Sequence, residues 1–489
     1  MNESEKQPKI EVRHTSILIH NYEINDEPEL QNQFSVYDPI KHRRSHKGML
    51  WDEEKKILYL PRGADINYLE KIFKEPATMK YDYDPFESMS IHAKVPPKDN
   101  MQRNATAFLI GAEKYNYTKK YSQMLLQMPP GSGKTFIITT ALQFIGMRAF
   151  IIVPNEKIKK QFIISLLKFT DIGSEHIIDV RGKSEINKIM RKDIPKWKVY
   201  VACHGTLISH AKRNGWESIE ELFKHTKVGV KIYDEAHLYF ENILKIDFHT
   251  NTKKTIYVTA TFKRSDYSEN ILFNKCFKNV VSFSLESKDI DKKHIMYLGI
   301  QYNSNPSLDE QTFMVTKMGF NKIRYANYQV EQSSFYDALD YTIKYFKEYE
   351  GKILILCSTI DGVEKIKKFI NDGYNDISVS SYHSKVTDDE REKAFTADII
   401  CTTPQSAGVG VDIPGLRVVI MCESYSSEVQ AEQVSGRLRE YGDSEDTFYV
   451  ELVDVGFPKV YKMWKGRLNV FKKKCKKMLS LDLTTKKDK

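Results

Sequence analysis

The sequence predicts an α/β protein with two parallel-sheet lobes and a small α+β accessory domain in front of them. Its 489 residues are too many for one hydrophobic core, since domains typically span about 100–200 residues. From about Met124 onward, apolar runs rich in β-branched residues alternate with helical patterns, which is typical of parallel strands joined by crossover helices. An interval without such runs divides them into two series, and two series indicate two lobes.

The accessory domain is expected at residues 1–95. Short strands are predicted there at Phe34–Tyr37, Gly48–Trp51 and Lys56–Leu60, followed by a helix at Ile66–Phe73. Trp51 is flanked by strand-like sequence, which favours a place in the core over an exposed binding role.

The first lobe is expected at residues 96–290 and the second at residues 346–456. Strands of the first lobe are predicted at Met124–Met128, Ala149–Val153, Val199–Ala202, Val228–Asp234 and Thr255–Thr259. Strands of the second lobe are predicted at Ile353–Cys357, Ile377–Tyr382, Asp398–Thr402, Val418–Cys422 and Thr447–Val453. Residues 291–345 are polar and aromatic and are expected to form a linker and lobe edge. Residues 457–489 are densely basic and are expected to form a helix and tail, for which a solvated, partly frayed segment is as good an explanation as a binding surface.

The composition favours a polyanionic partner, because the formal net charge is +9 and the isoelectric point is near 8.8. A lysine-rich usage inherited from an AT-rich genome explains the same charge equally well. The six cysteines form no Cys-x-x-Cys pair, so neither a zinc site nor a disulfide framework is indicated. The N-terminus is polar, and no apolar run approaches the ~20 residues of a membrane span. A soluble cytoplasmic protein is therefore expected.

A glycine-rich loop follows the first predicted strand of the first lobe. The run Met124-Leu-Leu-Gln-Met-Pro-Pro-Gly-Ser-Gly-Lys-Thr135 leads from this strand into a helical pattern. Glycines let backbone N–H groups converge on phosphate oxygens, and a helix N-terminus adds a favourable dipole. The pattern predicts an ATP site in which Lys134 reaches the β- and γ-phosphates and the Thr135 hydroxyl ligates Mg²⁺. Met128 stands where the general template has glycine. The candidate nucleotide-binding residues are Pro130, Gly131, Ser132, Gly133, Lys134 and Thr135.

Two carboxylates directly follow a later apolar strand, in Val228-Gly-Val-Lys-Ile-Tyr-Asp-Glu-Ala-His237. When no other motif accompanies it, an Asp-Glu pair after a strand usually lies in an ordinary solvated turn. Here a phosphate loop precedes the pair by about the length of a domain, which favours catalysis. Asp234 is then suited to hold Mg²⁺, and Glu235 is suited to orient and deprotonate the attacking water. We therefore expect ATP hydrolysis, with Lys134 and Glu235 both indispensable to turnover.

The four residues Asp234-Glu-Ala-His237 have the form of a DEAH box, and the chain resembles superfamily 2 helicases over roughly residues 97–455. The resemblance implies two RecA-like lobes and ATP hydrolysis linked to nucleic-acid binding. It implies that Gln102 reads the adenine base. It also implies that Pro154 and Thr206 touch the nucleic-acid backbone, a type of contact that fixes register without reading sequence.

Strand ends in the second series also resemble this family. Thr359, His383 and Thr403 stand where strand ends usually face nucleic acid. The glycine-rich segment after Thr403 resembles the family's fifth motif, whose glycines permit close backbone approach. This match implies that Gly410 and Asp412 lie at the nucleotide.

The run Gln433-Val-Ser-Gly-Arg-Leu-Arg439 resembles the family's sixth motif, which completes the ATP site from the second lobe. The match assigns Gln433, Arg437 and Arg439 to catalysis, where an arginine finger is worth ~10³–10⁵ in rate. The usual spacing places the last arginine at the position of Glu440, so which arginine is the finger stays open. Thr259-Ala-Thr261 resembles the motif that couples ATP state to the nucleic-acid track.

The accessory domain is similar, at a few positions around Gly48–Asp52 and Ile57–Gly63, to the N-terminal DNA-binding domain of phage UvsW-type recombination helicases. The similarity implies a basic loop in which Arg43 and Arg44 meet phosphates. It favours an ATP-dependent DNA helicase or translocase that unwinds or branch-migrates DNA in replication, recombination or repair. Single-stranded or branched DNA is then the expected partner, and the host cytoplasm the expected location for a phage or viral source.

Three other functions stay open. An RNA-stimulated ATPase or transcript-release factor of a viral transcription system would use the same lobes, and stimulation by RNA would identify it. The motor subunit of a restriction system would translocate without separating strands. A non-enzymatic binder with inactive motifs is disfavoured by the intact Gly-Lys-Thr and Asp-Glu residues. The oligomeric state is not indicated.

Overall fold

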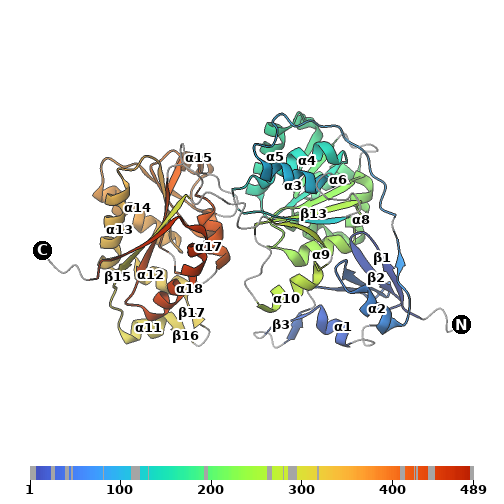
Figure 1. The fold of residues 1–489 in the computed structure, drawn as a ribbon, viewed down its shortest axis with the longest axis horizontal. Helices are drawn as coiled ribbons and strands as arrows, with labels where there is room; N and C mark the ends of the chain where they lie inside the picture. The colour runs from blue at the N-terminus through green and yellow to red at the C-terminus, as the bar shows by residue number, and fades with distance from the viewer. Residues whose placement is uncertain are drawn as a thin grey trace. The chain divides into compact units, whose positions relative to one another are not determined.

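The computed structural model describes residues 7–23, 28–38, 43–45, 48–80, 82–111, 122–129, 131–191, 197–260, 267–278, 280–284, 294–316, 319–407, 413–422, 424–425, 428–438 and 446–484. The chain forms two compact units, Met1–Asp289 and Ile290–Lys489 (Figure 1). Each unit holds a seven-stranded parallel sheet, and the first also holds a five-stranded mixed sheet. The predicted α/β class with two parallel-sheet lobes and an α+β region in front is confirmed.

The five-stranded N-terminal sheet has the strand order β5-β6-β2-β1-β7. Its strands are β1 (Lys9–Val12), β2 (Ser16–His20), β5 (Leu50–Asp52), β6 (Ile57–Pro61) and β7 (Thr78–Met79). Around it lie α1 (Pro28–Gln33), α2 (Ile66–Phe73) and the small pair β3 (Val36–Asp38) and β4 (Arg43–Ser45). β7 joins parallel to β1, and the other pairings are antiparallel. The predicted helix Ile66–Phe73 is confirmed, whereas β1 and β2, inside the sheet, were not predicted.

One hydrophobic core joins the N-terminal sheet to the first parallel sheet. Buried residues of β2 and β6 belong to the same cluster as Tyr233 and Phe273 of the first lobe, and half-buried Trp51 packs against it. The approach is close, because a Cβ at Gly63 would lie 2.2 Å from the Cys276 carbonyl oxygen. Trp51 therefore contributes to packing, and the N-terminal region is part of the first unit.

The first parallel sheet has the strand order β10-β11-β9-β12-β13-β8-β14. Its strands are β8 (Gln123–Gln127), β9 (Ala149–Val153), β10 (Ile177–Val180), β11 (Val199–Cys203), β12 (Val230–Tyr233), β13 (Lys254–Thr259) and β14 (Val281–Ser284). Its helices are α3 (Asn100–Ile110), α4 (Lys134–Ile145), α5 (Glu156–Phe169), η3 (Ser174–His176), α6 (Lys183–Met190), α7 (His204–Asn214), α8 (Glu217–Thr226), α9 (Phe240–Phe248) and α10 (Tyr267–Cys276). Figure 1 shows α3, α4 and α5 on one side of the sheet and α9 and α10 on the other. All five predicted strands are present, and β10 and β14 extend the sheet at its two edges.

The second parallel sheet has the strand order β19-β20-β18-β21-β22-β15-β23. Its strands are β15 (Ile295–Tyr302), β18 (Lys352–Leu356), β19 (Val379–Tyr382), β20 (Ile399–Thr402), β21 (Leu416–Met421), β22 (Thr447–Asp454) and β23 (Lys477–Asp482). Its helices are α11 (Leu308–Met314), α12 (Lys322–Gln329), α13 (Ser333–Phe346), α14 (Ile360–Gly373), α15 (Asp388–Ala394), α16 (Pro404–Ala407), α17 (Glu428–Ser435) and α18 (Pro458–Lys474), with the short pair β16 (Val315–Thr316) and β17 (Gly319–Phe320). Helices α13 and α14 cover one face, and α17 and α18 cover the other (Figure 1).

Two segments differ from expectation. Residues 291–345, expected as a linker and lobe edge, supply β15, which lies inside the second sheet between β22 and β23. Residues 457–489, expected as a helix and tail, form the expected helix as α18, but the segment after it supplies the edge strand β23. Both strands enter the sheet out of chain order, because their partners are set by tertiary pairing, which local sequence does not reveal.

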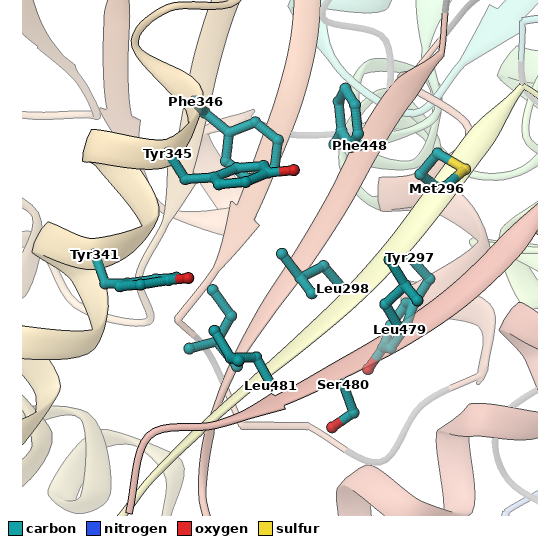
Figure 2. A pocket seen from close by; sticks show the side chains of 11 residues that line it. Met296, Tyr297, Leu298, Tyr341, Tyr345, Phe346, Phe448, Leu479, Ser480 and Leu481 are labelled. Carbon is teal, nitrogen blue, oxygen red and sulfur yellow. The ribbon is translucent and has the colours of Figure 1, made fainter. Parts of the chain in front are cut away.

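A cavity of about 300 Å³ lies in the second unit beside the strands β15, β22 and β23 (Figure 2). Its walls are mostly aromatic and aliphatic, and Tyr341, Tyr345 and Phe346 of α13 close one side. None of the residues assigned to the motifs lines it, and its chemistry is not that of a phosphate site.

The six cysteines are free and buried. Among the described residues, no group of three or more His, Cys, Asp or Glu side chains could hold a metal ion. Within the same ranges, no helix combines the length and apolar character needed to cross a bilayer.

Candidate functional site

The predicted phosphate loop connects β8 to α4. Gly131 and Gly133 have φ angles of +78° and +84°, left-handed conformations that glycine adopts without the strain a Cβ would bring. Helix α4 begins at Lys134 without a side-chain cap, so its first N–H groups are available to an anion. The Lys134 Nζ donates to the carbonyl oxygens of Met128 (3.2 Å) and Pro129 (3.4 Å). An ammonium and uncapped backbone donors thus meet at one helix N-terminus, with half-buried Thr135 one residue further on.

Gln102 lies against this loop. It is 4 % exposed, and Asp99 caps its helix by accepting from the Gln102 backbone N–H at 2.7 Å. The side-chain Nε2 donates to the Ser132 carbonyl at 3.4 Å, and Oε1 accepts from the Lys98 backbone N–H at 3.1 Å. A Cβ at Gly133 would lie 2.7 Å from Gln102 Nε2. The structure therefore brings Gln102 to the loop that the sequence assigned to phosphate.

Asp234 and Glu235 follow β12 and are both buried, at 7 % and 8 % exposure. Burial, reinforced by the Glu235 carboxylate, raises the pKa of Asp234 to about 7, and Lys134 opposes the shift. Burial also raises the pKa of Glu235, against the influence of Lys134 and the Ala260 backbone amide. Glu235 has a φ of +48°, and among the described residues no donor makes a hydrogen bond to its Oε2. Two carboxyl groups and the loop lysine therefore form one electrostatic unit.

Thr259, at the end of β13, connects the Asp-Glu segment with the phosphate loop. The Thr259 hydroxyl lies 2.9 Å from His237 Nδ1, and its carbonyl accepts from the Met128 backbone N–H at 3.0 Å. The same His237 nitrogen is 3.4 Å from Glu235 Oε2. His237 and Thr259 were not among the predicted site residues, although the motifs that contain them were recognised.

The two predicted nucleic-acid contacts of the first lobe follow the neighbouring strands β9 and β11. Half-buried Pro154 directly follows β9, ahead of Asn155, which caps α5 by accepting from the Ile158 N–H at 3.0 Å. Thr206, also half-buried, lies in the first turn of α7. Because the carboxyl ends of parallel strands share one edge, both residues lie on the same edge as the phosphate loop and Asp234.

The three predicted contacts of the second lobe follow β18, β19 and β20, which are neighbours in their sheet. Thr359 Oγ1 caps α14 by accepting from the Gly362 N–H at 3.1 Å. Buried His383 places Nε2 2.7 Å from Glu364 Oε1. Buried Thr403 donates to Ser406 Oγ at 3.0 Å. The structure thus brings these three residues to one sheet edge, and their contact with nucleic acid stays a prediction.

Several predicted residues lie outside the described ranges: Pro130, Gly410, Asp412 and Arg439. Of Arg43, Arg44 and Gln433 the structure describes only the backbone, in β4 and α17. Arg437 follows α17, and burial lowers its pKa to about 10.

Comparison with family models matches both lobes. Residues 97–264 match the model "Type III restriction enzyme, res subunit", and residues 335–442 match "Helicase conserved C-terminal domain". The first match contains the phosphate loop and the Asp-Glu pair, and the second contains the three strand ends just described.

Several curated proteins are similar to the chain over part or most of its length. A transcript termination protein of Yaba-like disease virus is 25% identical over 350 residues, 68% of this chain and 67% of the relative. That of Fowlpox virus (strain NVSL) is 24% identical over 344 residues, 65% of this chain and 67% of the relative. A putative DNA 3'-5' helicase of Haloarcula marismortui is 26% identical over 146 residues, 30% of this chain and 21% of the relative.

The fold recurs in a solved structure. S. cerevisiae Dbp5 bound to RNA and ADP BeF3 has a TM-score of 0.51 at 16% identity, covering 80% of this chain and 90% of that one. T4 UvsW covers 98% of this chain and 100% of that one, at 15% identity, with a TM-score of 0.38. That score is too low to support the expected similarity of the N-terminal region to UvsW-type recombination helicases.

Proposed function

The chain carries the two domains of a superfamily 2 helicase and is a nucleic-acid-dependent ATPase, and from this premise we propose that it acts in transcription, as an ATP-driven motor that releases transcripts. The observation that carries the proposal is the alignment with viral transcript termination proteins over about two thirds of both chains. The expected role in DNA recombination has no such support, so transcript release, first weighed as an alternative, becomes the main proposal.

The residues of the first lobe fit a magnesium nucleotide. Asp234 and Thr135 offer carboxylate and hydroxyl oxygens, and Mg²⁺ is commonly held by one or two protein oxygens together with phosphates. The raised pKa of Asp234 fits the same ligand, because a cation beside this buried carboxylate would favour its ionised form. Bound Mg·ATP would supply the phosphoryl group and the divalent charge.

Hydrolysis then depends on groups that the chain itself provides. Lys134 would exchange its two carbonyl contacts for phosphate oxygens and so neutralise charge. Glu235 would accept the proton of the attacking water, and burial favours this because it raises the carboxyl pKa toward the working pH. We assign adenine recognition to Gln102. The second lobe would add Gly410, Asp412, Gln433 and an arginine finger at Arg437 or Arg439.

The nucleic-acid track is proposed at the carboxyl edges of the two sheets. Pro154 and Thr206 would contact the backbone from the first lobe, and Thr359, His383 and Thr403 from the second. Contacts of this type hold the strand without reading sequence, as a motor that moves along it requires. Arg43 and Arg44 would add phosphate contacts in the N-terminal region.

A second candidate function is DNA unwinding without transcript release. The similarity to DNA 3'-5' helicases supports it, although that similarity covers only 30% of the chain. Both functions need the same ATP site, so mutations in that site cannot separate them.

The deciding experiment uses two labelled substrates in parallel. One is a duplex DNA bubble with an annealed RNA, and the other is a forked DNA duplex without RNA. ATP-dependent displacement is measured for the purified chain and for Lys134→Ala, together with ATPase activity in the presence of RNA, single-stranded DNA and branched DNA. We expect displacement of the RNA from the bubble to exceed fork unwinding, and the Lys134→Ala protein to do neither. Fork unwinding without RNA displacement would reject transcript release in favour of a DNA helicase.

A further inference from the structure

The positive charge of the chain is concentrated in one segment. Residues 455–481 contain eight lysines, one arginine and no carboxylate, a charge of +9. The formal net charge of the whole chain is also +9, so the remaining residues are neutral on balance. An ordinary solvated surface interleaves charges of both signs, and this segment does not.

Helix α18, which makes up most of this segment, has two distinct faces. Val460, Trp464, Arg467 and Phe471 are buried, at spacings of four, three and four residues. Exposed lysines occupy the opposite face: Lys459, Lys462, Lys465 and Lys472. At 1.5 Å per residue, this row is about 20 Å long. We call it the lysine face.

The buried side of α18 fixes the lysine face to the second sheet. Trp464 Nε1 donates to Tyr297 Oη at 2.6 Å, and Arg467 Nε donates to Glu451 Oε1 at 3.3 Å. The Phe471 ring lies 4.7 Å from that of Tyr297. The helix is therefore anchored along its length, which excludes for this part of the segment the frayed tail that was weighed against a binding surface.

Two ordinary explanations of a basic helix do not fit α18. A helix stabilised by surface ion pairs needs acidic partners, yet none of the described carboxylates pairs with the four lysines. Three of them, Lys459, Lys462 and Lys465, repel one another at i, i+3 spacing. A membrane-surface helix inserts its apolar side into the lipid, but here that side is committed to the protein core.

We propose that the lysine face is a binding surface for the phosphate backbone of nucleic acid, additional to the track at the sheet edges. The proposal rests on the proposed function in so far as that function makes nucleic acid the substrate. Lysine ammonium groups are point charges that attract phosphates without reading sequence. Because α18 packs beside α17, which holds the first residues of the sixth motif, the bound strand would lie next to the helix that leads into that motif.

The test is the salt dependence of binding by the full chain without ATP. The triple variant Lys462→Gln, Lys465→Gln, Lys472→Gln is compared with a control, Lys344→Gln, Lys347→Gln, Lys368→Gln. The exposed lysines of the control lie on α13, directly after it and on α14, across the sheet. Each lost contact lowers the slope of log K against log salt by about 0.9 for duplex or 0.7 for single strands. Between about 50 and 200 mM salt, the parent should lose roughly 40-fold more duplex affinity than the lysine-face variant. The control should keep the parental slope.

The outcomes separate this inference from the proposed function. A parental slope in the lysine-face variant, or an equal change in the control, overturns the inference. Competition by polyglutamate as effective as that by RNA would assign the surface to an acidic protein and also overturn it. ATPase activity that no nucleic acid stimulates would reject the motor function, while the binding slopes would still decide the role of the lysine face. Basal ATPase activity and melting temperature should match the parent in both variants, which confirms that they fold.

Discussion

Replacing Asp234 with asparagine should remove much of the pH dependence of stability in the first unit. Burial and the neighbouring Glu235 carboxylate raise the pKa of folded Asp234 from its ordinary value of 3.8 to about 7. The folded state binds the Asp234 proton more tightly than the unfolded chain does. The protonated carboxyl therefore contributes its full stability to the fold below about pH 4, and this contribution is lost as the pH rises through 7. At 1.36 kcal/mol per unit, the loss amounts to about 4 kcal/mol. For a unit of this size, that lowers the melting midpoint by on the order of 10 °C.

Calorimetry of the nucleotide-free chain at several pH values between 4 and 8 would measure this effect. The parental midpoint of the first unit should fall with rising pH, and that of Asp234→Asn should fall much less. Titrating groups far from Asp234 are common to both proteins and cancel in the difference, whereas the titration of Glu235, which interacts with Asp234, is part of the measured effect. Mg·ATP should reduce the parental slope and release a proton on binding below pH 7, because the carboxylate ionises beside the cation. Identical slopes in the two proteins would refute the argument that Asp234 is a buried group poised for a cation.

Four further predictions follow from contacts in the two units. Glu235→Gln should lower kcat by roughly 10²–10⁴-fold while leaving the binding of a fluorescent ATP analogue intact; normal turnover would remove Glu235 from catalysis. Gly133→Ala should weaken that binding by about tenfold, since a left-handed φ costs ~1–2 kcal/mol and the new Cβ would meet Gln102 at 2.7 Å. Thr259→Val loses a hydrogen bond worth about 1 kcal/mol and should reduce nucleic-acid stimulation several-fold more than basal hydrolysis; equal losses in both ATPase rates would contradict this coupling. Arg467→Ala leaves Glu451 buried without its cation and should destabilise the second unit by roughly 3–5 kcal/mol in denaturant unfolding.

The sequence predicted well those strands that precede a chemical motif. Met124–Met128 and Val228–Asp234 correspond to β8 and β12, because a buried parallel strand is a continuous apolar run whose end is marked by turn residues. The residues after each strand meet at one edge because the strands are parallel and their carboxyl ends share that edge of the sheet. Sequence reasoning alone therefore places Lys134, Asp234 and Glu235 at one edge of the sheet.

The contacts that adjust the chemistry were not predictable in the same way. The raised pKa of Asp234 depends on burial and on the Glu235 carboxylate, and neither follows from spacing. The bond between His237 and Thr259 joins two motifs that are 22 residues apart in the chain. Strand β15 has partners from the far end of the second unit, so no local pattern indicates its place in the sheet.

Helix α18 shows how composition can conceal periodicity. Averaged over its length, the segment is basic and polar, and that average suggested a solvated tail. Taken face by face, Val460, Trp464, Arg467 and Phe471 repeat at helical spacing and are buried, whereas the lysines occupy the other side. A frayed tail would not need such a repeat, since its apolar residues would have nothing to pack against. The packing of the buried residues at helical spacing explains why the helix is ordered. It does not explain the excess of lysine on the other side, which the proposed contact with a polyanion does.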